Sequence, residues 1–189
     1  MIDLRPLFYG LAGAARLMRL DISGAHMMVG GARGFWASIY WSAGLALPLF
    51  FLLMLLRYDP AKHDGWRYIF VHGEIYIIAW LVFPLVMDHV CTLLNRREKY
   101  LKFIIAYNWL NCFYNIFYLI IGLAQASGMT SWEGASAASV GMMLAGIVWI
   151  GYLTRHTLEI PYSAAVGIVV LDLFLSMMIS MLSAALLAG

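Results

Sequence analysis

Charged residues are scarce in this sequence. Of its 189 residues, 12% are Asp, Glu, Lys or Arg, whereas 63% are hydrophobic. An ordinary soluble domain has about 25% charged residues, and a chain this apolar has too few polar side chains to cover a folded surface. The mean hydropathy of +0.83 agrees. The composition therefore excludes an ordinary water-soluble domain and indicates an integral membrane protein.

Cysteine is equally scarce, because Cys91 and Cys112 are the two in the chain. Two cysteines in apolar segments form neither a disulfide framework nor a zinc pattern. His72 and His89 are about 25 Å apart along one helix and so are too distant to share a haem. His89 and His156 both lie near the predicted cytosolic side, where they could in principle share one, but we expect them to be interface residues. We therefore expect no metal and no cofactor.

Catalytic motifs are missing as well. The sequence contains no Gly-x-Ser-x-Gly, no His-Glu-x-x-His, no Walker loop and no Gly-x-Gly-x-x-Gly. With a net charge of only +2, it also has no basic run long enough to predict nucleic-acid binding. These absences predict a protein that is not an enzyme and that does not bind nucleic acid.

Five long apolar segments are what the sequence does contain, at residues 35–56, 68–94, 101–124, 134–154 and 162–187. Each has about 20 residues or more, which is enough for an α-helix to cross about 30 Å of hydrocarbon. The sequence therefore predicts an all-α bundle of five transmembrane helices, in a domain that covers residues 35–189.

Residues 1–34 are predicted to form a cytosolic amphipathic segment on the membrane surface. Apolar residues recur there at helical spacing, namely Leu4, Leu7, Phe8, Leu11, Ala14, Leu17 and Met18. Arginines interrupt or follow them, and these are Arg5, Arg16, Arg19 and Arg33. The pattern is typical of an interfacial helix whose basic side chains contact lipid headgroups. The alternative is a short helix packed on the protein's own loops.

Lysine and arginine are concentrated on one side of the predicted bundle. The N-terminal segment, the second-to-third loop and the fourth-to-fifth loop together hold nine, and the opposite side holds Arg57, Lys62 and Arg67. Cytosolic loops of membrane proteins carry the excess of these residues. We therefore expect the N-terminus in the cytosol and the C-terminus outside, in what we predict to be a bacterial inner (plasma) membrane.

Polar side chains at membrane depth are the first candidates for a functional site, because they are costly to place there. The third predicted span carries Asn108, Asn111 and Asn115, together with Cys112, at spacings of three and four that place them on one helix face. Such a face borders other helices or a wet cavity. Hydrogen bonding that holds the helices together is the alternative role.

The fifth span carries Asp172 about ten residues from its cytosolic end, near the middle of the bilayer. Ser176 and Ser180 follow at intervals of four, so we expect the acid on a small-residue face that packs closely against a neighbour. A carboxyl group at this depth either binds a proton, a cation or a partner, or is a neutral group hydrogen-bonded to an asparagine or a hydroxyl. Both interpretations stay open.

The second span carries Asp88 near its cytosolic end. One interpretation joins four residues in a polar pocket that opens to the cytosol, namely Asp88, Asn108, Asn111 and Asp172. The other pairs Asp88 with Arg96 or Arg97 at the interface. The fourth span has a stripe of small residues at intervals of four (Ala137, Gly141, Ala145), which predicts tight helix packing.

The succession of an amphipathic segment, five closely spaced spans and almost no C-terminal tail resembles the Yip family of membrane proteins and its bacterial relatives, from about Phe35 onward. Gly151 and Tyr152 match that family's Gly-Tyr signature, whereas its Asp-Leu-Tyr-Gly-Pro signature is not found. The run Gly-Phe-Trp-Ala-Ser at residues 34–38 is similar to the start of the first span in small bacterial inner-membrane proteins. The Yip resemblance implies membrane organisation or trafficking through partners, without enzymatic activity.

These observations predict a non-enzymatic membrane protein that acts through membrane-protein or lipid partners, as an accessory subunit, assembly factor or scaffold. The alternative is a small transporter or channel that uses Asp172 and the asparagines and that, with five spans, needs to oligomerise. We expect membrane lipids as partners, and either other membrane-protein subunits or further copies of the chain.

Overall fold

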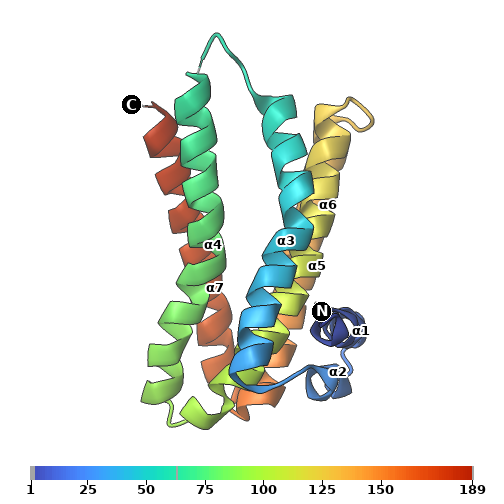
Figure 1. Cartoon of the computed structure of the whole chain (residues 1–189), viewed down its shortest axis with the longest axis vertical. Coiled ribbons are helices and arrows are strands. Elements are labelled where there is room, and N and C mark those ends of the chain that lie inside the picture. The colour runs from blue at the N-terminus through green and yellow to red at the C-terminus, as the bar shows by residue number, and fades with distance from the viewer. Residues whose placement is uncertain (1–2, 63, 189) are drawn as a thin grey trace.

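The structure, a computed structural model, describes residues 3–62 and 64–188, and helices account for most of them (Figure 1). Two short helices precede five long ones. In chain order the elements are α1 (Arg5–Leu17), α2 (Ser23–Met27), α3 (Gly31–Arg57), α4 (Gly65–Leu93), the 3-10 turn η1 (Arg97–Lys99), α5 (Tyr100–Ala126), α6 (Trp132–Leu158) and α7 (Tyr162–Ala188). No strand occurs within the described ranges.

The five helices α3 to α7 are long and apolar enough to cross a membrane. Each has 27 or 29 residues, or about 40 Å at 1.5 Å per residue. Because the hydrocarbon layer is about 30 Å thick, such helices tilt or extend into the headgroup region. The predicted all-α bundle of five spans is confirmed, and the chain is an integral membrane protein.

The first long helix starts earlier than the sequence predicts. α3 begins at Gly31, so the predicted boundary between residues 34 and 35 falls inside this helix. Gly30 before it is extended, and Gly31 has φ of +71°, a left-handed conformation that glycine adopts without steric penalty. The turn into the bundle is therefore made at these two glycines.

Helix α5 is the centre of the bundle. It packs along α3 on one side and α6 on another, while α7 packs on α6 and on α4. The backbones of α3 and α4, which follow each other in the sequence, are well separated in Figure 1, and side chains bridge them: Tyr68 and Tyr76 of α4 donate to the carbonyls of Met54 and Ala43 of α3. The pair α4–α7 therefore stands opposite the group α3–α5–α6.

Helix α1 lies across this bundle, and Figure 1 shows it end-on beside the upright long helices. Its buried face consists of small or compact residues, namely Pro6, Gly10, Gly13, Ala14 and Leu17. A Cβ atom on Gly10 would lie 2.0 Å from the ring of Trp109 on α5. At the other end, Trp149 Nε1 donates a hydrogen bond of 3.0 Å to the carbonyl of Met18. The helix is thus held against the membrane-spanning part of the protein.

The apolar face predicted for α1 is divided in the structure. Ala14 and Leu17 are buried against the bundle, whereas Leu4 and Phe8 are 44% and 65% exposed. The reason is that the glycine edge of the helix, beside that apolar face, meets Trp109. α1 therefore packs on the protein and still presents an apolar face outward, so it combines the two interpretations of the sequence.

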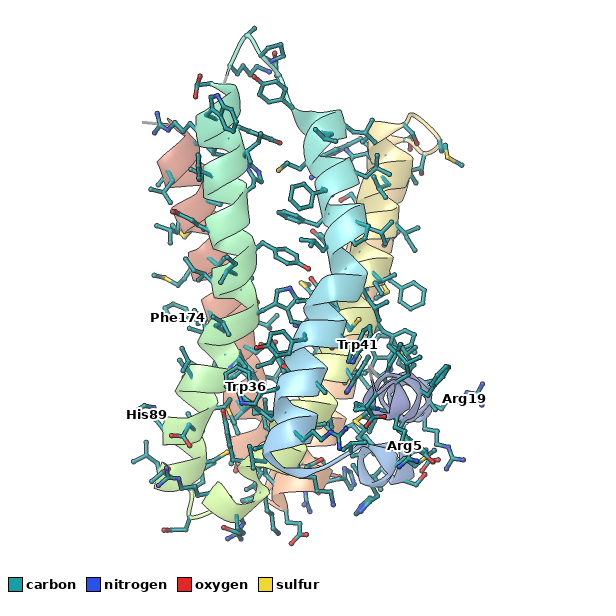
Figure 2. The ribbon with its side chains drawn as sticks, in the orientation of Figure 1. Arg5, Arg19, Trp36, Trp41, His89 and Phe174 are labelled. Atoms are coloured by element: carbon teal, nitrogen blue, oxygen red, sulfur yellow. The ribbon has the colours of Figure 1, made fainter. Side chains whose placement is uncertain are left out.

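The four arginines assigned to the lipid interface are exposed. Figure 2 shows Arg19 pointing away from the bundle. Arg16 donates to Ser23 Oγ at 3.1 Å, and Arg33 pairs with Asp3 at 2.5 Å. Arg5 lies beside the exposed apolar face of α1. An apolar face next to a basic face is the arrangement of a helix at the headgroup boundary.

We predict that Gly10→Leu releases α1 from the bundle. The added side chain has no room beside Trp109, and overpacking of this kind costs about 1–3 kcal/mol. Hydrogen–deuterium exchange in residues 5–17 should rise by about tenfold, while α3 to α7 stay protected. Ala12→Leu, at an exposed position of the same helix, is the matched control. Equal exchange in the two variants would show that the Gly10–Trp109 contact does not hold α1.

We also predict the orientation of the bundle from its charged ends. α1, η1 and Arg155 lie at one end, which has nine lysines and arginines against three at the other, and we expect this end to face the cytosol. A cysteine replacing the exposed Met129 should react with an impermeant maleimide on intact cells. A cysteine replacing the exposed Glu98 should react only after permeabilisation. Native Cys91 and Cys112 are buried and should not interfere. The opposite labelling pattern would reverse the orientation.

Candidate functional site

A cavity of about 650 Å³ lies between the pair α4–α7 and the group α3–α5–α6. Its volume falls within the range of about 300–1,000 Å³ that is usual for small-molecule sites. All five long helices contribute to its wall. Its polar lining consists of Tyr76, Tyr107, Asn111, Tyr114, Asn115, Tyr118, Ser136, Ser139, Asp172, Ser176 and Ser180.

The acid in this wall is Asp172, which is 8% exposed. Figure 2 shows Phe174 pointing away from the bundle, and a residue two positions earlier on a helix lies on nearly the opposite side. The hydroxyl of Tyr107 on α5 donates a hydrogen bond of 2.6 Å to Asp172 Oδ1. A hydroxyl donor satisfies a carboxyl oxygen in either charge state. The structure thus supplies the hydroxyl partner that one interpretation of Asp172 expected.

Tyr107 is itself held rigidly. It is 5% exposed, and its ring stacks on Phe83 of α4 with centroids 4.1 Å apart. Since Phe83 and Tyr107 both line the cavity, this stack and the bond to Asp172 join α4, α5 and α7 at one level of the membrane. The position of the carboxyl group is therefore fixed by three helices.

The asparagines of α5 divide into two sets. Asn111 and Asn115 line the cavity, and Asn115 Nδ2 donates to the Asn111 carbonyl at 2.8 Å and to its side-chain oxygen at 3.1 Å. Asn108 instead donates to Ser38 Oγ at 2.9 Å, and Cys112 Sγ lies 3.6 Å from the carbonyl of Ser42. The face of α5 that holds these polar residues spans about 100° around the helix axis. One side of this face therefore contacts α3, and the other side lines the cavity.

Asp88 lies away from the cavity, near the end of α4. Its Oδ1 is 3.7 Å from Arg97 Nε, which confirms the predicted interfacial ion pair. Neither Asp88 nor Asn108 belongs to the described lining, so the proposed polar pocket of all four residues is wrong. The cavity also extends away from the end of the bundle to which the predicted pocket was expected to open. Its wall extends from Asp172 to Ser136, which is about 6 Å from the start of α6 at the end opposite Arg97.

Three tyrosines of α5 were missed by the sequence analysis, namely Tyr107, Tyr114 and Tyr118. The predicted site was defined by the spacing of the asparagines, and these tyrosines were not included in it. The spacing 107, 111, 114, 118 is itself a helical stripe and could have identified them. Gly146 makes room for Tyr114, because a Cβ atom there would lie 2.8 Å from the tyrosine ring.

Two predicted packing faces are not packed within the described chain. Ser176 and Ser180 of α7 are exposed and border the cavity, so the close contact expected there is wrong. On α6, Ala137 and Gly141 are also exposed, and a Cβ atom built on Gly141 meets nothing within 4 Å. The reason is that α6 turns other residues toward α5, including Gly146. The small-residue stripe of α6 thus lies on the outside of the bundle.

No protein-family model matches the chain, nor does any curated protein or solved structure. The resemblance to the Yip family therefore stays a prediction. Over residues 3–62 and 64–188, no three His, Cys, Asp or Glu side chains are placed to hold one metal ion. What the site offers chemically is one acid, amides, hydroxyls and aromatic rings around a space of ligand size.

We predict that Asp172 and Tyr107 are energetically coupled. In a double-mutant cycle with Asp172→Ala and Tyr107→Phe, each of which removes the bond, the coupling free energy of unfolding should be about 1 kcal/mol, a usual size for a hydrogen bond within a membrane protein. Unfolding in mixed detergent micelles measures it. The control pairs Asp172→Ala with Asn108→Ala, which should be additive within about 0.5 kcal/mol, because Asn108 bonds to α3 instead. Additivity in both cycles would contradict a direct bond.

Proposed function

We propose that this protein is a small membrane transporter that binds an amphipathic organic cation in its intramembrane cavity. The observation that carries the proposal is the lining of that cavity, which has one carboxyl group, Asp172, and no Lys, Arg or His among its described residues. Ionisable residues at membrane depth that face a cavity commonly mark a substrate or ion path.

The preference for a cation follows from electrostatics. A carboxylate removed from water is stabilised by a positive partner, and Asp172 has a hydroxyl neighbour but no cationic one among the interactions described for it. Aromatic rings attract cations to their faces. The wall of the cavity contains seven aromatic side chains, namely Phe50, Tyr76, Trp80, Phe83, Tyr107, Tyr114 and Tyr118.

The rest of the lining favours an amphipathic shape for the ligand. Val169, Leu173 and Ile147 give the wall an apolar part, while Asn111 and Asn115 supply amide groups about one turn apart. Sites for small molecules combine such an apolar wall with few polar groups that orient the ligand. A compact apolar body with one positive group fits both features.

The arrangement of helices supports movement of the ligand. The backbones of α3 and α4 approach each other at few points. Rocking of α4–α7 against α3–α5–α6 would therefore exchange side-chain contacts, such as the bond from Tyr76 to the Ala43 carbonyl, together with the packing of α7 on α6. Motion of one helix group against another around a central site is the usual route to alternating access. With the cationic end in the cytosol, the serine-lined half of the cavity belongs to the outer half of the membrane.

A partner-dependent role is the second candidate, as accessory subunit, assembly factor or scaffold. The observation that favours it is the uncovered small-residue stripe of α6 at Ala137 and Gly141. Stripes of this kind let membrane helices approach closely. A partner helix there, from a second copy or another protein, is compatible with transport by an oligomer and also with a scaffold function.

We predict that purified protein in neutral phosphatidylcholine nanodiscs binds tetraphenylphosphonium, a compact lipophilic cation. Asp172→Asn should lower the affinity by about tenfold or more, equivalent to about 1.4 kcal/mol, because the carboxylate no longer faces the cation. Tetraphenylborate, which has the same shape and the opposite charge, should bind much more weakly to the unaltered protein. Equilibrium dialysis with radiolabelled ions measures both.

Asp88→Asn is the matched control, because it removes an acid of α4 that lies outside the cavity and pairs with Arg97. Its affinity for tetraphenylphosphonium should equal that of the unaltered protein. An equal loss of affinity in Asp172→Asn and Asp88→Asn would indicate attraction of the cation to the general surface charge and would contradict the proposed site. Failure of every cation to bind, in protein that purifies with a stoichiometric second protein, would favour the scaffold function.

A further inference from the structure

A second groove, separate in its chemistry from the cavity, lies between α6 and α7 near the cationic end of the bundle. Its volume is about 280 Å³. Its lining comprises Ile147, Val148, Gly151, Tyr152, Arg155 and His156 of α6 and Tyr162, Ala165 and Val166 of α7. The proposed transport function makes no use of these polar groups.

The groove is divided along the membrane normal. Arg155, His156 and Tyr162 lie within the last turn of α6 or the first turn of α7, at the level of the interface. Val148 and Val166 lie deeper and are 53% and 59% exposed. Charged and aromatic groups at the interface with apolar groups beneath them match the two parts of a phospholipid.

Arg155 carries a positive charge without a carboxylate partner in the described chain. Its guanidinium carbon lies 5.0 Å from the ring centroid of Tyr162, and its Nε is buried without a hydrogen-bond acceptor. Stacking on a ring covers the face of the guanidinium, whereas phosphate binds its N–H edge. The contact with Tyr162 therefore orients Arg155, and its two terminal nitrogens, which make no hydrogen bond within the described chain, are the donors left for an anion.

The nearest acid in the sequence does not neutralise Arg155. Glu159, one turn further along, pairs with Lys99 instead. The hydrogen bond from Lys99 and its positive charge hold the pKa of the Glu159 carboxyl below its usual range, so Glu159 is charged and committed to Lys99 at neutral pH. Its pairing with Lys99 leaves the excess positive charge in the groove uncompensated.

Groups beside Arg155 add capacity for a phosphate. His156 Nδ1 lies 2.9 Å from the carbonyl of Tyr152, and the His156 ring stacks near that of Tyr152 with centroids 4.2 Å apart. Its Nε2 has no hydrogen bond within the described chain. Gly151 lines the groove and presents no side chain to it, and a Cβ atom there would make one ordinary contact, 3.7 Å from Val169 of α7.

We propose that this groove binds one anionic phospholipid, whose phosphate pairs with Arg155 and whose acyl chain lies over Gly151 between Val148 and Val166. The charge of the groove selects an anion, and its apolar depth selects a lipid over free phosphate. The cationic end of the bundle, expected in the cytosolic leaflet, is also where anionic lipids attract basic side chains.

Native mass spectrometry of the whole chain in mild detergent tests the proposal, with phosphatidylglycerol and phosphatidylcholine of identical acyl chains as probes. The unaltered protein should retain one phosphatidylglycerol in preference to phosphatidylcholine. Arg155→Gln should lower the phosphatidylglycerol affinity by about tenfold or more, the usual effect of losing a charge-assisted hydrogen bond. Arg155→Lys should give a smaller loss of affinity, because lysine keeps the positive charge but lacks the planar guanidinium that binds phosphate through two N–H groups.

Two further variants keep the test decisive. Gly151→Leu fills the groove without changing any charge, so it should also weaken phosphatidylglycerol binding, and it serves if Arg155→Gln fails to fold. Arg97→Gln removes a cation at the same end but outside the groove and should leave binding unchanged. Equal losses in Arg97→Gln and Arg155→Gln would overturn the proposal in favour of general surface attraction. Displacement of the lipid by millimolar inorganic phosphate, or full binding in Gly151→Leu, would overturn the acyl-chain assignment.

Discussion

The polar side chains of α5 have to find their hydrogen-bond partners inside the bundle, and the rest of the structure depends on that constraint. Hydrocarbon offers no donor or acceptor, so a polar group facing lipid is left unsatisfied. Asn108 meets this requirement through Ser38 of α3, and Tyr107 meets it through Asp172 of α7. These two bonds point to different neighbours, and they explain why α5 is at the centre.

The same constraint accounts for the cavity. α5 carries more polar groups than α3 can satisfy, and the remainder faces α4 and α7. Asn111 and Asn115 partly satisfy each other along their own helix, so no neighbour has to close tightly over them. Small residues on the facing helix α7, such as Ser176 and Ser180, fill little of the space. A polar surface that is only partly satisfied internally is suited to a ligand or to water.

The sequence allowed the five spans to be predicted because hydropathy is a local property of each segment. The pairing of Asp172 with Tyr107 could not be predicted, because 65 positions separate them and the spacing along one helix does not reveal which neighbour it faces. The spread of the asparagines was misjudged for the same reason, since a face about 100° wide borders two environments. For α1, periodicity gave an amphipathic helix, but the contact of Gly10 with Trp109 depends on tertiary packing. Asp88 was predictable because Arg97 is nine positions away, across a short turn.

The cavity and the lipid groove are not mechanically independent. Ile147 of α6 lines both, and α7 contributes Asp172 to the cavity and Val166 to the groove, six residues or about 9 Å apart. The separation of α6 from α7 therefore sets the width of both spaces. An acyl chain in the groove would resist the approach of these helices, and a ligand beside Asp172 would do the same from the other side. If a bound lipid changes the affinity of the cavity for its ligand by some factor, the ligand must change the affinity of the groove for the lipid by the same factor. The lipid composition of the membrane would therefore set the affinity of the cavity through the position of α6.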